Sequence, residues 1–508
     1  MKEKFYITTA IAYTSGKPHI GNTYEAVLAD AIARHKRLLG YDVYFQTGTD
    51  EHGEKIELKA KNNEKECQEF VDEVSDEIKN IWKKLNISYD KFVRTTESHH
   101  KEIVQKIFKK LYDQGDIYLD NYEGYYCIPC ESFWTESQLI DGKCPDCDRE
   151  VELRKEPAYF FKLKNYEKKL NSYIKEHPDF IYPKIRENEM LNNFLKPGLE
   201  DLCVSRTSFK WGIPVPFDDK HVIYVWLDAL TNYITNIGYD PDKDNENFNK
   251  LWPCDLHVVG KDIVRFHTIY WPIILMALGL PLPKRVFGHP WVLAGTEKMS
   301  KSKGNVLYAD ELCDKYGVDV VRYCYLHEIS FANDGTITED ILIERNNSDL
   351  ANTLGNLVNR TIVMVNKYFD GKVMRNIEDN PLDNDLRSYM ESLNEKICQK
   401  MDELKIQEAT ELILTACRKC NKYIDENEPW ALAKSEEKMD RLNTVLYNLI
   451  QSIRIIAINL QAFLPDTANK ILKLINIDDK TYISSKQFDT DSDEIRTNKE
   501  EILFKRIQ

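Results

Sequence analysis

Hydrophobic residues near the start of the chain follow a strand pattern, then a helical pattern, then a strand pattern again. The segments FYITTAI (5–11) and VYFQTGTD (43–50) have the β-branched and aromatic content of buried strands. Between them, TYEAVLADAIARHKRLL carries alanine and leucine at helical spacing and ends at Gly40, a residue type that commonly terminates helices. This pattern predicts a βαβ unit.

The same alternation returns in the second part of the chain. HVIYVWLDAL (221–230), LHVVGKD (256–262) and KRVFGHPWVL (284–293) read as strands, separated by helical stretches such as FHTIYWPIILMALG. The long segment between the two sets is rich in charged and aromatic residues and contains four cysteines. We therefore expect an α/β fold in which a doubly wound parallel sheet of the Rossmann type is split by an insert.

The last third of the chain has a different pattern. Gly and Pro become rare after Asp349, and long Leu, Ile, Asn, Lys and Glu patterns predict an all-α bundle domain. Beyond about Lys480 the polar, mixed-charge sequence predicts a tail or a strap packed on the surface. The expected domains are the first Rossmann half (1–117), an insert (118–220), the second Rossmann half (221–294), a loop and linking region (295–348), the helical domain (349–478) and a C-terminal tail (479–508).

Composition narrows the class of protein. The 508 residues include 69 Lys and Arg against 83 Asp and Glu, so the formal net charge is −14. Long-range attraction to nucleic acid or an anionic membrane is not expected from this average, and a polyanion must meet local basic patches. No apolar run of about 18 residues occurs, and no signal peptide is recognised, which predicts a cytoplasmic protein without a membrane partner.

Four of the twelve cysteines have the spacing of a metal site. Cys127-Ile-Pro-Cys130 is followed, after thirteen residues, by Cys144-Pro-Asp-Cys147, which is close to the zinc-ribbon template. Four thiolates close the tetrahedron and leave no open position. The spacing predicts one structural Zn²⁺ that organises the insert.

Two other groups of candidate residues do not have such a pattern. Cys417 and Cys420 form a lone CxxC inside a helical pattern, without a second pair or a thioredoxin-like context. DEHG (50–53) contains three ligand types, but consecutive residues at a strand end point in different directions. We expect neither group to hold a metal and leave His52 without a role.

The junction between the first strand and its helix reads His19-Ile-Gly-Asn22. In a doubly wound sheet this junction is where main-chain N–H groups and the helix dipole attract phosphate. Gly21 lets a ligand approach the backbone, and His19 and Asn22 add side-chain donors. Taken alone, the four residues favour an ordinary strand-helix turn with an Asn cap, so a second motif is needed.

The second motif is GTEKMSKSKGN (295–305), which carries Lys298, Lys301 and Lys303 between two glycines. Ammonium groups on a flexible loop suit a polyphosphate whose charge grows as a bond to phosphorus breaks. A solvated surface loop is the alternative for any lysine-rich segment. The basic loop is expected to bind a polyphosphate only because it occurs together with the first motif.

Taken in order, the His-x-Gly-(His/Asn) turn, the half-sheet, the insert, the second half-sheet and Lys-Met-Ser-Lys-Ser resemble the class I aminoacyl-tRNA synthetases across nearly the whole chain. AIAYTSGKPHIGN, TGTDEHGEKI, YVWLDALTNY and GKDIVRFHTIYWP are similar to the motifs of the methionine-specific family, in its bacterial type with a single zinc knuckle. The resemblance implies a ligase that joins methionine to ATP, releases pyrophosphate and transfers methionine to the 3′ end of a tRNA with a CAU anticodon. Mg²⁺ is expected with ATP. Asn22 is a departure, because the family usually has a second histidine there.

The resemblance also implies roles for single residues. A thioether packs well against aromatic rings, Asp50 could hold an ammonium group, and an indole can stack on an anticodon base. The implied amino-acid pocket is Ile11, Tyr13, Asp50, Trp226, Ala229, Leu230, Tyr233 and His267; the ATP site is Gly21, Gly260, Asp262, Lys301 and Arg206; the catalytic residues are His19, Asn22, Lys298 and Lys301; and the anticodon site is Asn356, Arg360 and Trp430.

Several alternatives stay open at this point. The aromatic residues could be ordinary core, and Arg206 a surface residue of the insert. The whole chain could be a small-molecule nucleotidyltransferase, a class I synthetase of another specificity, or a non-catalytic RNA-binding or zinc module. Longer family members carry an extra C-terminal dimerisation domain, which is not recognised here, so we expect a monomer.

Overall fold

The structure is a computed structural model that describes residues 2–134, 136–295, 306–378, 380–489, 492–499 and 501–507. The chain divides into two compact units. Unit 1 comprises residues 1–29, 42–83 and 87–291, and unit 2 comprises residues 30–41, 84–86 and 292–508.

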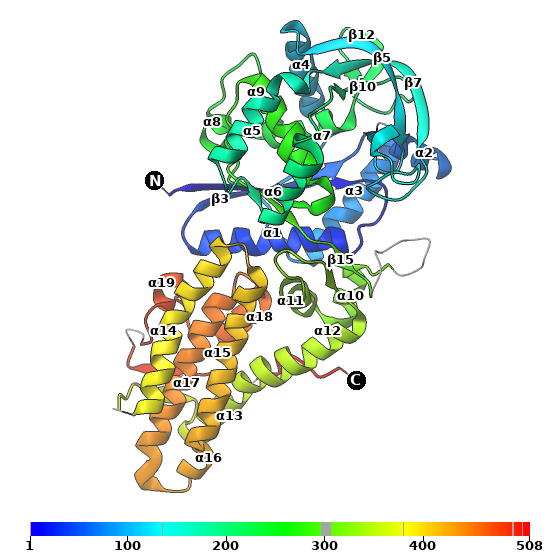
Figure 1. Cartoon of the computed structure of the whole chain (residues 1–508). Helices are drawn as coiled ribbons and strands as arrows, with labels where there is room; N and C mark the ends of the chain where they lie inside the picture. Colours follow the sequence, from blue (N-terminus) through cyan, green and yellow to red (C-terminus); the bar gives the residue numbers. More distant parts are fainter. Residues whose placement is uncertain are drawn as a thin grey trace. The chain divides into compact units, whose positions relative to one another are not determined.

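Unit 1 is built on a parallel sheet (Figure 1). Thr49 pairs with Ala12 on one side and with Arg94 on the other, so β2 and β4 lie on opposite edges of β3. β2 therefore continues the line of β1, and the order across the sheet is β4, β3, β1 with β2, β13, β14 and β8. The strands are β1 (Lys4–Thr9), β2 (Ala12–Tyr13), β3 (Asp42–Asp50), β4 (Lys91–Arg94), β8 (Ile181–Tyr182), β13 (Leu256–Gly260) and β14 (Val286–His289).

The predicted doubly wound sheet is confirmed, and its reversal of strand order lies between β1 and β13. The strand predicted at 221–230 is wrong, because a strand of a separate antiparallel sheet ends at Ile223 and a helix begins at Val225. The chain leaves β1 in one direction, toward β3 and β4, and continues after the insert on the other side, from β13 to β14. Ligands of doubly wound sheets bind outside the carboxyl ends of the strands at such a point. The residues that follow β1, β3 and β13 are therefore the place to look for a site.

The helices of unit 1 share one apolar core with the sheet. The core includes Tyr6 on β1, Phe108 on α4 and Trp271 on α9, all fully buried. Buried side chains recur at helical spacing, as on α3, where Val71, Val74 and Ile78 face inward. The helices are α1 (Ile20–Leu38, whose second half is grouped with unit 2), α2 (Glu54–Asn62), α3 (Cys67–Lys84), α4 (Ser98–Asp113), α5 (Glu167–Glu176), α6 (Lys184–Met190), α7 (Val225–Thr235), α8 (Glu246–Leu251) and α9 (Trp271–Leu278).

The segment between the two Rossmann halves forms two small antiparallel sheets. One has the order β6-β5-β7-β9 and the other the order β10-β12-β11. β8 comes from the same stretch of sequence but adds to the edge of the main parallel sheet through β14. The strands are β5 (Ile117–Cys127), β6 (Ser132–Trp134), β7 (Glu152–Phe161), β9 (Leu202–Cys203), β10 (Ser205–Arg206), β11 (Pro214–Val215) and β12 (Asp218–Ile223).

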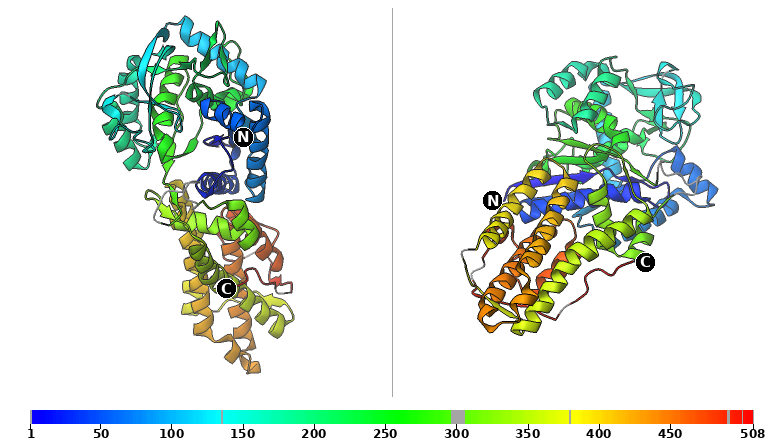
Figure 2. Two further views of the ribbon diagram at one scale, coloured as in Figure 1. Left: turned by 90° about the vertical axis from the view of Figure 1, so that its right-hand side faces the viewer. Right: turned by 60° about the horizontal axis from the view of Figure 1, so that its bottom comes forward.

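Unit 2 is mainly helical, and α17 is its central helix. Every residue of α17 from Thr444 to Leu460 is buried, because α13, α14, α15, α18 and α19 pack around it (Figure 2). The helices are α10 (Ala309–Tyr316), α11 (Val318–Glu328), α12 (Glu339–Arg345), α13 (Asn356–Phe369), α14 (Pro381–Asp402), α15 (Ile406–Asn427), α16 (Pro429–Leu432), α17 (Met439–Leu460), α18 (Pro465–Leu474) and α19 (Tyr482–Ser485).

A buried ion pair ties together distant parts of unit 2. The fully buried Arg322 on α11 donates to the carboxylate of Asp30 at 2.7 Å and to the carbonyl oxygens of Leu85 and Phe463 at 3.0 Å. A buried guanidinium needs this complete set of acceptors, because an unpaired buried charge is strongly destabilising. The second half of α1 is thus held inside unit 2.

The C-terminal segment runs as a strap over unit 2. Tyr482 is buried, with its hydroxyl 3.1 Å from Nδ1 of His35. β18 (Glu494–Arg496) pairs in antiparallel fashion with β17 (Lys372–Met374), and the main-chain N–H of Ile507 donates to Asn347. The unit also contains the short parallel pair β15 (Val292–Leu293) and β16 (Gly335–Thr336).

None of the described helices combines the length and the apolar character needed to cross a bilayer. All twelve cysteines are free thiols, which leaves the two CxxC pairs of the insert available as metal ligands.

Candidate active site and metal centre

α1 begins with the His19-Ile-Gly-Asn22 turn. The side-chain oxygen of Asn22 accepts a hydrogen bond from the main-chain N–H of His19 at 3.2 Å, and Nδ1 of His19 accepts one from the N–H of Gly21 at 3.1 Å. Because Nδ1 is an acceptor, the neutral imidazole carries its proton on Nε2. The turn is therefore capped by its own side chains.

Asp50 ends β3, directly opposite Tyr13 of β2 in the strand register. Its side chain is buried, and its Oδ1 has no hydrogen-bond partner among the described residues. Burial, together with the negative charges of Asp228 and Glu131, raises the pKa of Asp50 well above its usual value. A buried carboxylate without a counter-charge is costly, and a substrate ammonium group is one that would compensate it.

The end of α7 and the turn before α9 bring together three of the predicted pocket residues. The hydroxyl of Tyr233 donates to Nε2 of His267 at 2.8 Å, and Nδ1 of His267 donates to the carbonyl oxygen of Ile263 at 2.9 Å. Burial lowers the pKa of His267 to about 4, so the ring is neutral at physiological pH. Trp226 stacks on Phe266 at 3.6 Å, and its indole nitrogen is buried without a hydrogen-bond partner.

The remaining predicted pocket residues lie on the same elements. Ala229 and Leu230 are buried on α7, between Trp226 and Tyr233, and Ile11 is half-buried between β1 and β2. An apolar pocket with a few polar groups is the usual form of a small-molecule site.

Gly260 ends β13 at the reversal point of the sheet, and Asp262 lies in the turn that follows. A Cβ atom at position 260 would lie 2.7 Å from Oδ1 of Asp262, so only glycine leaves that carboxylate in place. The same oxygen accepts a hydrogen bond from the indole N–H of Trp291 at 3.1 Å, and the ammonium of Lys261 lies 4.0 Å over the Trp291 ring. A fixed carboxylate at a strand end can accept two ribose hydroxyl groups.

Arg206 is held inside the insert. Its side chain is fully buried, its guanidinium lies 3.9 Å over the ring of Tyr126, and its Nε donates to Glu156 at 2.6 Å. No described hydrogen bond or ion pair joins it to His19 or Asp262. One nitrogen, Nη1, is nevertheless buried without an acceptor.

The sequence analysis did not identify two buried acidic residues near the predicted site. Asp228 on α7 is fully buried between two imidazoles: Nδ1 of His52 and Nε2 of His100 each lie 2.7 Å from one of its oxygens. These contacts lower its pKa despite burial. An Asp within the apolar stretch VWLDAL was a usable signal of a buried, paired carboxylate, whereas nothing near His100 indicated its partner.

The second missed residue is Glu131, which directly follows Cys130. It is buried, and its Oε1 accepts hydrogen bonds from the hydroxyl of Tyr13 at 2.8 Å and from the N–H of Lys55 at 3.1 Å. Burial raises its pKa to about 7. The two predicted catalytic lysines of the basic loop, Lys298 and Lys301, lie outside the described residues.

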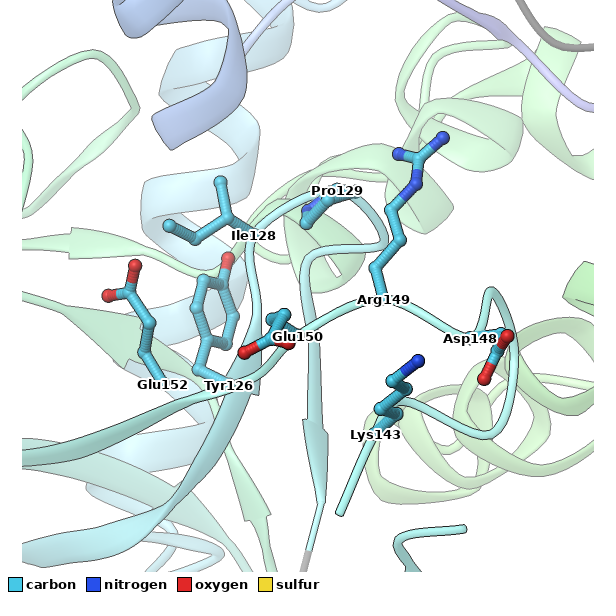
Figure 3. Close-up of a pocket in the computed structure, with 8 residues that line it drawn as sticks. All are labelled: Tyr126, Ile128, Pro129, Lys143, Asp148, Arg149, Glu150 and Glu152. Carbon is cyan, nitrogen blue, oxygen red and sulfur yellow. The ribbon is translucent and has the colours of Figure 1, made fainter. Parts of the chain in front are cut away.

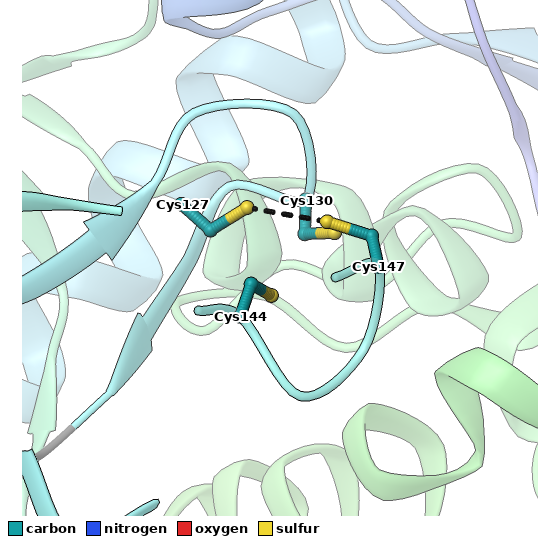
Figure 4. Close-up of side chains that lie close together, drawn as sticks. All are labelled: Cys127, Cys130, Cys144 and Cys147. Atoms are coloured by element: carbon teal, nitrogen blue, oxygen red, sulfur yellow. Dashed lines mark hydrogen bonds between the residues drawn. The ribbon is translucent and has the colours of Figure 1, made fainter. Parts of the chain in front are cut away.

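The four cysteines of the insert converge on one point (Figure 4). Their sulfur atoms all lie within 4.8 Å of one another, and those of Cys127 and Cys147 are 3.6 Å apart. Zn–S bonds of about 2.3 Å in a tetrahedron place the sulfurs about 3.8 Å apart, so the set fits this ion. Among the described residues this is the only cluster of three or more such ligands.

A surface pocket of about 450 Å³ lies beside the knuckle (Figure 3). It carries charges of both signs and contains none of the predicted substrate-binding residues. Its lining consists of Tyr126, Ile128, Pro129, Lys143, Asp148, Arg149, Glu150 and Glu152. The predicted active site at the strand ends is therefore separate from this pocket.

In unit 2 the structure places the predicted anticodon residues on α13 and α16. Asn356 is exposed at the start of α13, and Arg360 lies one turn later. The guanidinium of Arg360 lies 5.9 Å over the ring of Trp430, which is 42% exposed. Trp430 is therefore a surface residue, and its ring offers a face to a ligand.

Comparisons with known proteins decide the family. A family model described as "tRNA synthetases class I (M)" matches residues 5–152 and 147–362, and one described as "Anticodon binding domain of methionyl tRNA ligase" matches residues 375–508. The chain belongs to the methionyl-tRNA synthetase family. The resemblance inferred from the sequence motifs is thus confirmed.

Relatives and solved structures of the family match along nearly the whole chain. The methionine–tRNA ligase of Clostridium acetobutylicum is 57% identical over 506 residues, covering 100% of this chain and 78% of that protein, and the one of Clostridium tetani is 56% identical, with 100% and 79% covered. A Mycobacterium tuberculosis methionyl-tRNA synthetase bound by methionyl-adenylate superposes with a TM-score of 0.94 at 40% identity, covering 99% of this chain and 100% of that one.

The convergence of the four sulfurs makes the metal site testable. We expect Cys144→Ala to lose bound metal, because three thiolates cannot complete the tetrahedron, while the Rossmann halves stay folded. Cys417→Ala, which removes a fully buried thiol from α15, is the control and should keep its metal. Metal content by plasma mass spectrometry and far-UV circular dichroism measure both effects. Full metal content in Cys144→Ala would show that the ligand assignment is wrong.

Proposed function

We infer that this protein is a methionine–tRNA ligase. The observation that carries this conclusion is the 57% identity to a methionine–tRNA ligase over the full chain. The reaction has two steps. The methionine carboxylate attacks the α-phosphorus of ATP, pyrophosphate leaves, and the resulting methionyl group then passes to a ribose hydroxyl at the 3′ end of tRNA, with release of AMP.

We propose that the strand ends of the parallel sheet position both reactants. Asp50, with its unpaired buried oxygen, holds the methionine ammonium group, while Trp226, Tyr233 and His267 surround the thioether. Asp262 accepts the ribose hydroxyl groups of ATP from the other side of the reversal point. Since both steps are attacks by a positioned oxygen nucleophile, orientation and charge stabilisation account for catalysis without a covalent enzyme intermediate.

We propose the start of α1 as the phosphate-binding element, together with Arg206 and the basic loop that contains Lys298 and Lys301. The support is the position of the His19–Asn22 turn at a helix N-terminus beside the reversal point of the sheet. The Asn22 side chain already caps this turn. His19, through Nε2, is then the main side-chain donor to phosphate.

We propose that the four-cysteine cluster holds one structural Zn²⁺, because four thiolates leave no position for a substrate. Mg²⁺ is expected to accompany ATP, with phosphate oxygens and water as most of its ligands. The partners are methionine, ATP and a methionine-accepting tRNA with a CAU anticodon. Such a tRNA is used in the cytoplasm, which is the proposed location.

The anticodon site is proposed on unit 2. The exposed Trp430 can stack on an unpaired base, and Asn356 and Arg360, on one face of α13, can bond the edge of a base. The cation–π contact of Arg360 with Trp430 keeps the ring in place before the RNA arrives.

Methionine-dependent exchange of pyrophosphate into ATP tests the proposed reaction. We expect exchange with methionine and none above background with leucine or isoleucine at equal concentration. Exchange with a different amino acid only would overturn the specificity, and no exchange with any amino acid would overturn the activity.

Substitutions in the His19–Asn22 turn test its role. We expect His19→Ala to slow adenylate formation on the order of 10²-fold, the usual effect of removing a preorganised donor. Asn22→Ala should have a smaller effect, because Asn22 bonds the turn itself, and Asn22→His should be tolerated. Single-turnover adenylate formation measures all three variants. Wild-type rates in His19→Ala would exclude phosphate binding by this turn.

Trp430→Ala tests the anticodon site. A lost base stack is worth about 1 to 3 kcal/mol, so kcat/KM for tRNA charging should fall about 5- to 150-fold, while pyrophosphate exchange stays at the wild-type rate. Trp430→Phe keeps a stacking face and should fall less. Ile377→Ala, at another exposed apolar residue of unit 2, is the control for a general surface effect. Equal losses in charging and exchange would mean that Trp430 acts through stability.

A further inference from the structure

Glu131 occupies a backbone conformation that is unfavourable for its residue type. Each CxxC of the insert is followed by a residue in the left-handed region: Glu131 with φ 50° after Cys130, and Asp148 with φ 56° after Cys147. This conformation costs a residue with a Cβ about 1 kcal/mol or more, and Asp tolerates it better than longer side chains do. Glycine would be the favoured residue at both positions. A glutamate that persists there points to a function of its side chain.

The Glu131 side chain leaves the knuckle and enters the wall of the predicted methionine pocket. Its Oε1 accepts from the hydroxyl of Tyr13 at 2.8 Å and from the N–H of Lys55 at 3.1 Å. The space is made by Gly53, where a Cβ atom would lie 2.4 Å from Oε1 and 2.8 Å from the Tyr13 hydroxyl oxygen. The carboxylate is thus enclosed on three sides, and the Tyr13 ring cannot turn without losing a charge-assisted hydrogen bond.

The main chain of the same residue contacts the residue that precedes α7. The hydroxyl of Tyr224 donates to the carbonyl oxygen of Glu131, and Tyr224 directly precedes α7, which carries Trp226. One residue therefore contacts both the Tyr13 side and the α7 side of the pocket.

A second contact joins the knuckle to the pocket independently of Glu131. Trp134 on β6 lies 4.5 Å from the guanidinium carbon of Arg265, which in turn lies 4.8 Å from the ring of Phe266. Phe266 stacks on Trp226. Arg265 also lies 3.8 Å from Asp146, between the last two cysteines. The knuckle is therefore packed against the pocket through Trp134 and Arg265 even when the Glu131 side chain is removed.

We propose that Glu131 is a positioning residue for methionine binding, through which the metal knuckle orients Tyr13 in the pocket wall. This role rests on the proposed function and on the assignment of Tyr13 to the methionine pocket. Glu131 acts as a hydrogen-bond acceptor for Tyr13 and Lys55 and does not touch the reacting atoms. A change at Glu131 should affect methionine affinity and leave ATP affinity unchanged.

Glu131→Gly is the test variant, because glycine adopts the left-handed conformation without strain and leaves the knuckle intact. We expect the KM and the dissociation constant for methionine to rise about tenfold, the loss that follows from about 1.4 kcal/mol of hydrogen bonding. The KM for ATP, kcat, metal content and melting temperature should stay within experimental error of wild type. Isothermal titration calorimetry gives the methionine affinity without turnover.

Three further variants test whether Glu131 acts by positioning Tyr13. They distinguish this role from an effect of the backbone change and from an effect of the carboxylate charge. Glu131→Gln keeps an acceptor oxygen for Tyr13 and should stay within about threefold of wild type. Asp148→Gly makes the same backbone change in the second knuckle turn, whose side chain lines the surface pocket, and should change nothing. In a Tyr13→Phe background, Glu131→Gly should have a much smaller effect, because the hydroxyl bond is already absent.

The outcomes that overturn the proposal are distinct from those that overturn the function. Wild-type methionine affinity in Glu131→Gly, an equal rise in the KM for ATP, loss of metal, or additive effects with Tyr13→Phe would each exclude the positioning role. A Glu131→Gln variant as impaired as Glu131→Gly would mean that the charge itself acts on the substrate. Failure of the wild-type protein to exchange pyrophosphate with methionine would instead overturn the proposed function.

Discussion

The parallel pairing of β1 with β13 is the contact on which the active site depends. It sets Ile7 beside Leu256 and Thr9 beside Val258, so that segments 249 residues apart in sequence become neighbours. Parallel strands end at the same edge of a sheet, and this pair lies where the strand order reverses. The residues after β1 and β3 therefore lie at the same edge of the sheet as those after β13.

Buried negative charge is the second constraint on the site. Asp50, Glu131 and Asp228 all lie in the protein interior, and their surroundings differ. Asp228 is held between two imidazoles, and Glu131 accepts hydrogen bonds from a hydroxyl and a main-chain N–H. Asp50 alone keeps an unpaired oxygen, with a pKa raised by burial and by its two acidic neighbours.

The insert contributes more to the site than its metal ligands. The spacing of its cysteines predicts a metal knuckle, because the two residues of each CxxC pair are close together in the sequence. The sequence did not indicate the hydrogen-bond partners of Glu131, because Tyr13 and Lys55 belong to other elements. The same holds for Asp228, whose apolar surroundings signalled burial but could not indicate His52 and His100. The partner of Arg206, Glu156, was likewise not indicated by the sequence around either residue.

The sequence by itself determined the features that depend on neighbouring residues along the chain. These are most of the alternation of strands and helices, the cysteine pairs, the turn at the start of α1 and the helical last third of the chain. Motif order was enough for the family, because these local patterns occur together in few folds. Tertiary structure alone decided the strand order, the carbonyl and carboxylate partners of Arg322, the exposure of Trp430 and the enclosure of Glu131. Each of these depends on contacts between residues far apart in sequence, and burial and pairing at such contacts are set by the packing of whole elements, which no local pattern specifies.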